Sequence, residues 1–127
     1  MVDRAEVEAR IRELHAARVR GDLAAMCQLF TDDAAFHIAG SSGGKPIEIA
    51  AHGLRELKPW LAMLVKTFSL SDYVLLAMIV DGTRAAIHWR AEIFSKITGK
   101  SVATELVDLI EIRGGRIARY KEFFVPK

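Results

Sequence analysis

The chain has 127 residues, of which 51% are hydrophobic and 27% charged, a composition typical of one folded domain and not of a disordered chain. Its 18 basic and 16 acidic residues are interleaved and leave a formal net charge of +2, so no nucleic-acid-binding stripe is predicted. The longest apolar run, residues 73–80, is too short to span a bilayer, and the charged N-terminal segment is unlike a secretory signal. We therefore predict a single domain over residues 1–127, located in the cytoplasm, without a nucleic-acid or membrane partner.

The N-terminal segment is predicted to form two helices. Asp3 and Glu6 have the spacing of a capping box, and apolar residues recur after them at helical spacing as far as Gly21. Glycine at that point is well suited to the left-handed conformation that ends a helix. Asp22 is then expected to cap a short second helix over residues 23–30.

The middle of the chain is predicted to combine two strands with a third helix. Residues 34–40 alternate between apolar and polar side chains, which predicts a strand, and residues 47–50 predict a second, short strand. Between them, residues 41–46 are rich in serine and glycine and are expected to be a flexible loop, a candidate lid or disordered segment. Residues 54–69 have apolar side chains at helical spacing and predict the helix.

The second half of the chain is predicted to be an antiparallel meander. Four β-rich runs are separated by short turns that contain glycine, at residues 72–80, 84–97, 101–112 and 116–125. Connections this short join neighbouring antiparallel strands. The sequence therefore predicts an α+β fold, in which helices cover one face of an antiparallel sheet of four to six strands.

Several motifs of known chemistry are absent from the sequence. It contains no glycine-rich phosphate loop, no nucleophile elbow and no Cys-x-x-Cys pair, and its single cysteine, Cys27, is expected to be a small buried side chain. The four histidines lie on separate predicted elements, so no metal site is predicted. With no asparagine and one glutamine, a pocket must take its polar groups mainly from charged, aromatic and hydroxyl side chains.

Two segments resemble a known family. Residues 20–36, RGDLAAMCQLFTDDAAF, are similar to the helix-to-strand signature of SnoaL-like and ketosteroid-isomerase-like proteins, within the nuclear transport factor 2-like superfamily. Residues 105–124, ELVDLIEIRGGRIARYKEFF, are similar to the closing hairpin of the same proteins. The resemblance implies a cystatin-like fold, in which a strongly curved antiparallel sheet and N-terminal helices form a cone-shaped pocket, often in a homodimer. It implies no cofactor, and the fold hosts isomerases, cyclases, epoxide hydrolases, dehydratases and non-catalytic binders.

Residue by residue, the resemblance to the ketosteroid isomerases is partial. Their protonated aspartate corresponds to Asp108, but their proton-moving aspartate corresponds to Ile38 and their helix tyrosine to Leu14. Ile38 cannot move a proton and Leu14 cannot donate a hydrogen bond, so steroid isomerisation is not expected. Two apolar pocket positions on the last strand correspond to Tyr120 and Phe124.

Asp108 is the leading candidate for a catalytic residue. Strand alternation places it on the same face as Leu106, a face that is apolar except for Asp108 and Thr104. A buried carboxyl must find a partner or take up a proton, so Asp108 is expected to be an acid/base or hydrogen-bond donor in the pocket. The alternative is a salt-bridged or locally solvated aspartate that serves packing alone. The opposite face, with acids at its edges and aliphatic residues between them, is expected to meet a partner subunit.

A second polar group lies on the strand predicted over residues 84–97. His88 and Arg90 share one face of this strand, and Trp89 lies on the other. The two polar residues either face water or line the cavity, where one of them would pair with Asp108 in a charged acid/base cluster. Both alternatives are compatible with the sequence.

The pocket is expected to have mainly apolar walls, with Trp60 of the long helix as its roof and Glu122 near its mouth. His15 directly follows Leu14 in the first helix, and helix neighbours point about 100° apart, so His15 is expected to point away. The residues predicted to contact a ligand are Leu14, Phe36, Ile38, Trp60, Leu106, Tyr120, Glu122 and Phe124.

These expectations favour an enzyme-like protein that binds a small hydrophobic molecule and converts it by acid/base chemistry of the isomerase, cyclase, hydrolase or dehydratase type. The alternative is a non-catalytic module that binds a small ligand or dimerises, in which Asp108 is structural. A homodimer is expected under either alternative.

Overall fold

The computed structural model describes residues 3–126, and in this range three helices and six strands follow one another. The terminal residues 1–2 and 127 of the predicted domain lie outside the described part. None of the described helices is long and apolar enough to cross a membrane. The elements are α1 (Arg4–Arg20), α2 (Leu23–Gln28), β1 (Phe30–Ser42), β2 (Lys45–His52), α3 (Leu54–Thr67), β3 (Phe68–Asp81), β4 (Arg84–Ser95), β5 (Ser101–Arg113) and β6 (Arg116–Pro126).

The strands form one mixed sheet in the order β2-β1-β6-β5-β4-β3. All neighbouring pairs are antiparallel as predicted, with the exception of β1 and β6, which run parallel. The prediction of a purely antiparallel sheet is wrong at this pair. Short turns fix the direction of the other strands, whereas β1 and β6 lie far apart in the sequence, so no turn constrains their pairing.

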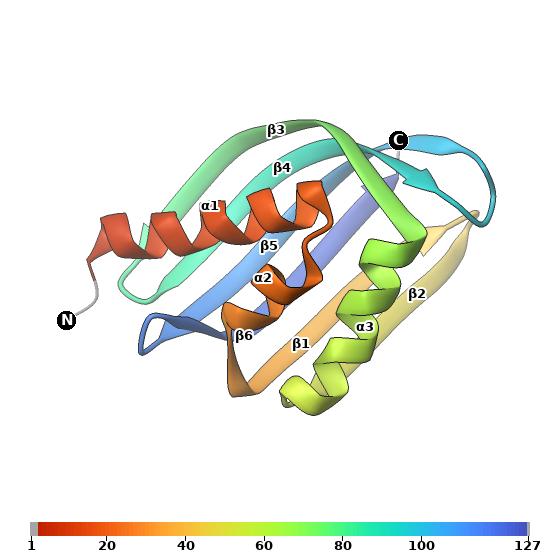
Figure 1. Ribbon diagram of the computed structural model, residues 1–127. Helices are drawn as coiled ribbons and strands as arrows, with labels where there is room; N and C mark the ends of the chain where they lie inside the picture. The colour runs from red at the N-terminus through yellow and green to blue at the C-terminus, as the bar shows by residue number, and fades with distance from the viewer. Residues whose placement is uncertain (1–2, 127) are drawn as a thin grey trace.

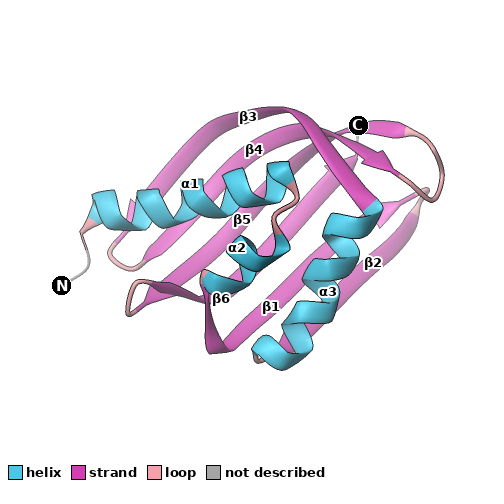
Figure 2. Ribbon diagram, viewed as in Figure 1, coloured by secondary structure: helices cyan, strands magenta, loops and turns pink. Residues whose placement is uncertain are grey.

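The predicted arrangement of helices on one face of a curved sheet is confirmed. Figure 1 shows α1 lying across β3, β4 and β5, and α3 lying over β1 and β2, all on the concave side. Figure 2 shows that the outer face of the sheet carries no helix. Strand β3 arches strongly, and it contains a bulge at Asp72, which has a left-handed φ of 52° and interrupts the pairing with β4. The open, unclosed sheet and the helices thus form a cone.

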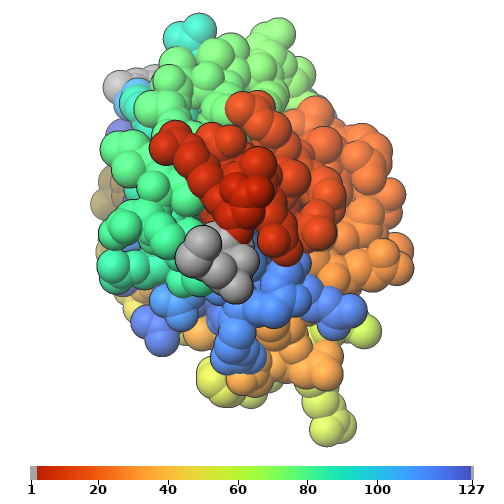
Figure 3. Space-filling view, turned by 90° about the vertical axis from the view of Figure 1, so that its left-hand side faces the viewer, coloured from red at the N-terminus to blue at the C-terminus, as the bar shows by residue number. Residues whose placement is uncertain are grey.

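Both ends of α1 have the predicted caps. The Asp3 side chain accepts a hydrogen bond from the Ala5 backbone N–H, and Gly21 adopts a left-handed φ of 71°. Arg10 Nε also donates to the Gly115 carbonyl oxygen at 3.0 Å, in the turn between β5 and β6. Viewed from this end, the start of α1 lies between the β3–β4 and β5–β6 turns (Figure 3). The helix is therefore fixed to the sheet along its length.

Residues 41–46 form a tight hairpin and not the expected flexible loop. Strands β1 and β2 pair up to Ser42 and Lys45, which leaves a turn of two residues. These residues, Gly43 and Gly44, have φ values of 58° and 79°, and glycine adopts such values without steric cost. The candidate lid is therefore a regular turn between two paired strands.

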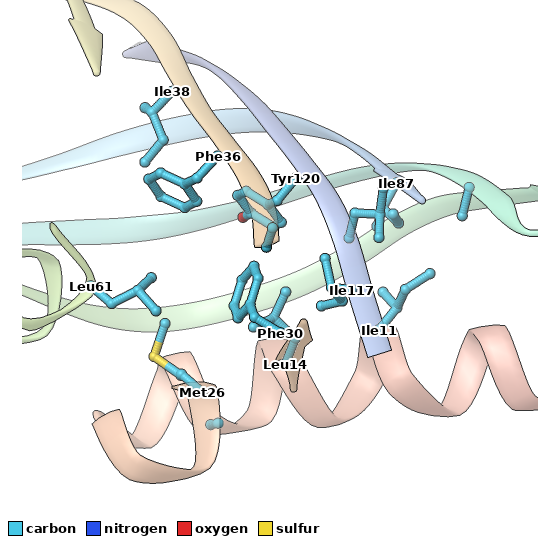
Figure 4. Close-up of a cluster of buried hydrophobic side chains, with 14 of the residues drawn as sticks. Ile11, Leu14, Met26, Phe30, Phe36, Ile38, Leu61, Ile87, Ile117 and Tyr120 are labelled. Carbon is cyan, nitrogen blue, oxygen red and sulfur yellow. The ribbon is translucent and has the colours of Figure 1, made fainter. Parts of the chain in front are cut away.

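The hydrophobic core fills the space between the helices and the concave face. Leu14 and Met26 from the helices face Phe30 and Phe36 of β1 and Tyr120 of β6 (Figure 4). The rings of Phe36 and Tyr120 are stacked, with centroids 5.4 Å apart. The space between the helices and the concave face is thus packed with side chains.

Candidate functional site

Helix α1 brings two polar side chains into the core. The buried residues Val7, Ile11 and Leu14 form its apolar stripe, and His15 and Arg18 lie four positions after Ile11 and Leu14. His15 is only 2% exposed, and the side chain of Arg18 is 10% exposed. The concave face of the sheet therefore receives a histidine and an arginine from the helix.

His15 meets Asp108 at the centre of the concave face. Its Nε2 lies 2.9 Å from Asp108 Oδ2, and the Trp89 indole N–H donates to the same oxygen at 2.9 Å. Asp108 is 0% exposed, and its other oxygen, Oδ1, is the one buried side-chain polar atom without a hydrogen-bond partner in residues 3–126. Unpaired buried oxygens are uncommon, because each loses its hydration without compensation.

Tyr73 extends this contact toward the edge strand β3. Its hydroxyl oxygen lies 2.6 Å from His15 Nδ1. When Asp108 is ionised, the imidazole donates from Nε2 to the carboxylate and accepts at Nδ1 from the Tyr73 hydroxyl. Tyr73 is half-buried, so it joins the fully buried carboxyl to the surface.

Arg18 and Glu122 form a second contact beside the first. Arg18 Nη1 donates to Glu122 Oε1 and, at 3.3 Å, to the Tyr120 hydroxyl oxygen, while Tyr120 donates to Glu122 at 3.0 Å. The guanidinium also lies over the Trp89 ring, 5.3 Å from its centroid. Because Glu122 pairs directly with Asp108 across β5 and β6, the two contacts adjoin. We call the seven residues the buried polar cluster: His15, Arg18, Tyr73, Trp89, Asp108, Tyr120 and Glu122.

Burial sets the protonation of this cluster. It raises the pKa of Asp108 to about 6, although Arg18 and the hydrogen bonds to the carboxyl act in the opposite direction. Burial, assisted by the charge of Arg18, lowers the pKa of His15 to about 4. Burial also raises the pKa of Glu122. At neutral pH the cluster thus holds a neutral imidazole and a carboxylate that protonates under mildly acidic conditions.

The cavity next to the cluster is small. A volume of about 10 Å³ remains between α1, α2, α3 and the sheet, which is room for about one water molecule. Two cluster residues, Arg18 and Tyr120, belong to its wall. The other lining residues are apolar: Leu14, Met26, Phe30, Phe36, Leu61 and Leu64. The cluster therefore borders an apolar space that side chains now almost fill (Figure 4).

Most of the residues predicted to contact a ligand lie on the concave face. Leu14, Phe36 and Tyr120 line the small cavity, whereas Ile38 is buried beside it. Leu106 is buried on the same face as Asp108. Phe124 is half-buried, and its ring lies against Gly40 of β1. The tryptophan predicted as the roof, Trp60, is 38% exposed at the margin of the buried face of α3, and Leu61 and Leu64 occupy the position expected for it.

The predicted alternative in which His88 or Arg90 pairs with Asp108 is wrong. Both residues lie on the convex face, because Trp89 between them points into the core. His88 Nε2 lies 2.8 Å from Glu105 Oε1, and Arg90 is exposed. The hydrogen-bond partners of Asp108 are His15 of α1 and Trp89 of β4 instead.

Four residues of the cluster were missed as site residues from the sequence: His15, Arg18, Tyr73 and Trp89. His15 was expected to point away, but the buried arc of α1 is wide enough for both Leu14 and His15. Continuing the four-residue spacing from Ile11 and Leu14 would have placed His15 and Arg18 on the buried face. For Tyr73 the bulge at the preceding residue shifts the strand alternation, and no sequence pattern indicates that shift. No group of three potential metal-binding side chains gathers in the described range 3–126.

Comparisons with known proteins agree with this architecture. A Bacillus subtilis protein provisionally assigned as an isomerase superposes with a TM-score of 0.83 and 19% identity, over 98% of this chain and 90% of the other. An LEH-like epoxide hydrolase from M. tuberculosis superposes with a TM-score of 0.75 and 14% identity, over 95% of this chain and 84% of the other. A Mesorhizobium loti protein provisionally assigned as a SnoaL-like polyketide cyclase superposes with a TM-score of 0.67 and 18% identity, over 91% of this chain and 97% of the other. At these identities the similarity establishes the fold alone.

The search among curated proteins finds no match. The sequence profile of the SnoaL-like domain matches residues 11–120, which is most of the chain and includes every residue of the buried polar cluster except Glu122. The chain belongs to the SnoaL-like family.

Proposed function

We propose that this protein is an acid/base enzyme for a small hydrophobic molecule, with Asp108 as the group that moves the proton. The observation that carries the proposal is the state of Asp108: fully buried, paired with His15, and left with one unpartnered oxygen. Acid/base catalysis requires a titrating group whose pKa lies near the working pH, and burial brings the Asp108 carboxyl toward that range.

The proposed roles follow from the contacts. In its ionised form Asp108 accepts a proton at Oδ1, the oxygen that makes no hydrogen bond of normal geometry within residues 3–126, although Tyr120 and Glu122 lie near enough to lower the pKa of the carboxyl. Neutral His15 and Trp89 hold Oδ2 by two donated hydrogen bonds and so fix the orientation of the carboxyl. The apolar residues around the small cavity would bind the body of the molecule, after Met26, Leu61 and Leu64 move to enlarge the space. The isomerase and hydrolase names of similar folds are compatible with this chemistry.

A ligand screen followed by a variant tests the proposal. Steroid, polyketide-like and terpene-like compounds are screened by thermal shift, and each binding compound is incubated with the protein in D2O and analysed by mass spectrometry. We expect at least one compound to raise Tm and to gain mass by exchange or hydration. In the Asp108→Asn variant, which keeps the size of the side chain, the mass change should disappear. Equal conversion by the wild type and the variant would contradict the role of Asp108.

The specific observation that favours a non-catalytic module is the small size of the cavity. A protein that never binds a ligand has no need of an open pocket, and its buried polar cluster would then serve only the specificity of packing. The same screen separates the two functions. Compounds that bind the wild type and the Asp108→Asn variant alike, without conversion, would support a binding module.

The assembly that we propose under either function is a homodimer through the convex face of the sheet. No helix covers this face (Figure 2). It carries several exposed apolar side chains. In an isolated chain these apolar side chains would remain in contact with water, which is unfavourable. A second copy with the same patch is the occupant that its apolar character favours. We call these residues the convex patch: Val74, Ile79, Val107, Leu109, Phe123 and Val125.

A further inference from the structure

We propose that Arg18 is the ligand-anchoring residue and that its Nε and Nη2 groups donate hydrogen bonds to an uncharged oxygen on an otherwise apolar molecule. This inference rests on the proposed function, because it names the chemical class of compound for the same cavity. Ketones, esters and lactones carry such an oxygen. Two observations on Arg18 and one on the charge of the cluster support it.

The first observation is the position of Arg18 in the cavity wall. Its side chain is nine-tenths buried, and it shares the wall with six apolar residues and Tyr120. Arginine is rarely buried to this extent, and the guanidinium is the one cation of the cluster at neutral pH. A molecule that enlarges this cavity therefore meets an apolar wall and a single cationic hydrogen-bond donor.

The second observation concerns the donors of the guanidinium. Both of its hydrogen bonds, to Glu122 and to Tyr120, come from Nη1. Within the described residues, Nε and Nη2 donate no hydrogen bond. A guanidinium has five N–H donors in a planar fork. Because Asp108 Oδ1 is the one buried side-chain polar atom without a partner in residues 3–126, Nε and Nη2 are not sealed from contact and can reach an acceptor. The unused side of the fork is thus suited to an oxygen acceptor that the protein itself does not provide.

The charge of the cluster decides which oxygen fits. Asp108 and Glu122 lie opposite each other on adjacent strands, so two carboxyl groups share the single positive charge of Arg18. A ligand carboxylate would add a third negative group to a site that already has one in excess. A neutral carbonyl oxygen adds no charge and still accepts two hydrogen bonds. We therefore infer that the site selects the uncharged acceptor over the anion.

The test uses three probes of similar size: cyclohexanone, methylcyclohexane and cyclohexanecarboxylate. Their dissociation constants at pH 8 are measured by NMR titration, and the carbonyl of cyclohexanone carries ¹³C. For the wild type we expect cyclohexanone to bind about tenfold more tightly than the other two probes, with a downfield shift of its carbonyl resonance. The Arg18→Lys variant keeps the charge beside Glu122 but loses the planar fork, so the shift and the preference should both decrease. The control is Arg12→Lys, the same substitution at an exposed site on α1, which should change neither.

A second variant tests the charge argument. Glu122→Gln removes one negative charge and keeps the size of the side chain, so cyclohexanecarboxylate should bind about tenfold more tightly than it binds the wild type. If cyclohexanone and methylcyclohexane bind equally, and Arg18→Lys changes neither, Arg18 is not the anchor, whereas the apolar pocket of the proposed function remains supported. If no probe binds up to its solubility limit, the inference and the pocket fail together. If cyclohexanecarboxylate binds most tightly to the wild type, the preference for an uncharged oxygen is overturned.

Discussion

His15 and Asp108 are 93 positions apart in the sequence, and their side chains meet at 2.9 Å in the centre of the cone. Burial moves their pKa values in opposite directions, so that the carboxyl accepts a proton before the imidazole does. This reversal of the ordinary order makes the pair a candidate acid/base centre and leads to an unusual pH dependence of stability.

We predict that this pair makes the free energy of unfolding of the wild type depend only weakly on pH. In two single variants, the free energy of unfolding should change with pH in opposite directions. Asp108 has an ordinary pKa of 3.8 and a folded value of about 6, so it lowers the free energy of unfolding as pH rises from about 4 to 6. His15 has an ordinary pKa of 6.5 and a folded value of about 4, so it raises that free energy over nearly the same interval. The two contributions oppose each other and largely cancel.

The opposite slopes are measured by urea unfolding at several pH values. Relative to the wild type, Asp108→Asn should gain stability as pH rises from 4 to 6.5, and His15→Gln should lose it, each by on the order of 2 kcal/mol. His37→Gln is the matched control, because His37 is half-buried against exposed Glu48 on the other face. Parallel curves for all four proteins would show that the pair does not titrate as stated.

The ion pair between Arg18 and Glu122 should show strong energetic coupling. Arg18→Met leaves the Glu122 carboxylate buried without its partner, and the free energy of unfolding should fall by about 3–5 kcal/mol. In the double variant Arg18→Met/Glu122→Leu no charge remains unpaired, so the loss should be much smaller than the sum of the single losses. Urea unfolding of the four proteins gives the coupling energy. Additive losses would mean that the two side chains do not interact in solution.

Gly40 should be required for the packing of Phe124. A Cβ atom at position 40 would lie 2.5 Å from the Phe124 ring, which is closer than atoms can approach. Gly40→Ala should therefore displace the ring and lower the free energy of unfolding by about 1 kcal/mol. In a Phe124→Leu background, which removes the ring, the same substitution should cost less. An equal cost in both backgrounds would point to the backbone of β1 and not to the ring.

The convex patch should hold the proposed dimer together. A lysine at position 123 puts a charge within the patch, so Phe123→Lys should shift the protein from dimer to monomer in light scattering. Val19→Lys serves as control, because Val19 is similarly exposed but lies on α1. A wild type that is monomeric at all concentrations would remove the dimer proposal.

The sequence predicted the fold well because local patterns determine most of it. The caps at Asp3 and Gly21 and the alternation around Asp108 were correctly interpreted, since each depends on a few neighbouring residues. The parallel pairing of β1 and β6 was not predicted, since it depends on long-range contacts. The hairpin at Gly43 was not predicted either, since it depends on backbone geometry.

The sequence predicted the part of the candidate site that lies on β5 and β6, but not the part that lies on α1. Strand alternation assigned Asp108 to the concave face, the family resemblance placed Tyr120 in the pocket, and Glu122 shares the strand face of Tyr120; all three are buried there. Their partners on α1, His15 and Arg18, were not predicted to be buried. The apolar face of a helix can be narrow or wide, and only packing against the sheet decides whether these two residues belong to it. The polar contacts between helix and sheet are therefore a property of the tertiary structure.

The most direct test of Asp108 as the proton-moving group is a titration of its carboxyl carbon by ¹³C NMR, with Asp108→Asn to assign the resonance. Burial of the carboxyl predicts a pKa of about 6, well above that of an ordinary aspartate, although Arg18 and the hydrogen bond from Trp89 act in the opposite direction. A pKa near 4, like that of an exposed aspartate, would contradict the proposed acid/base role.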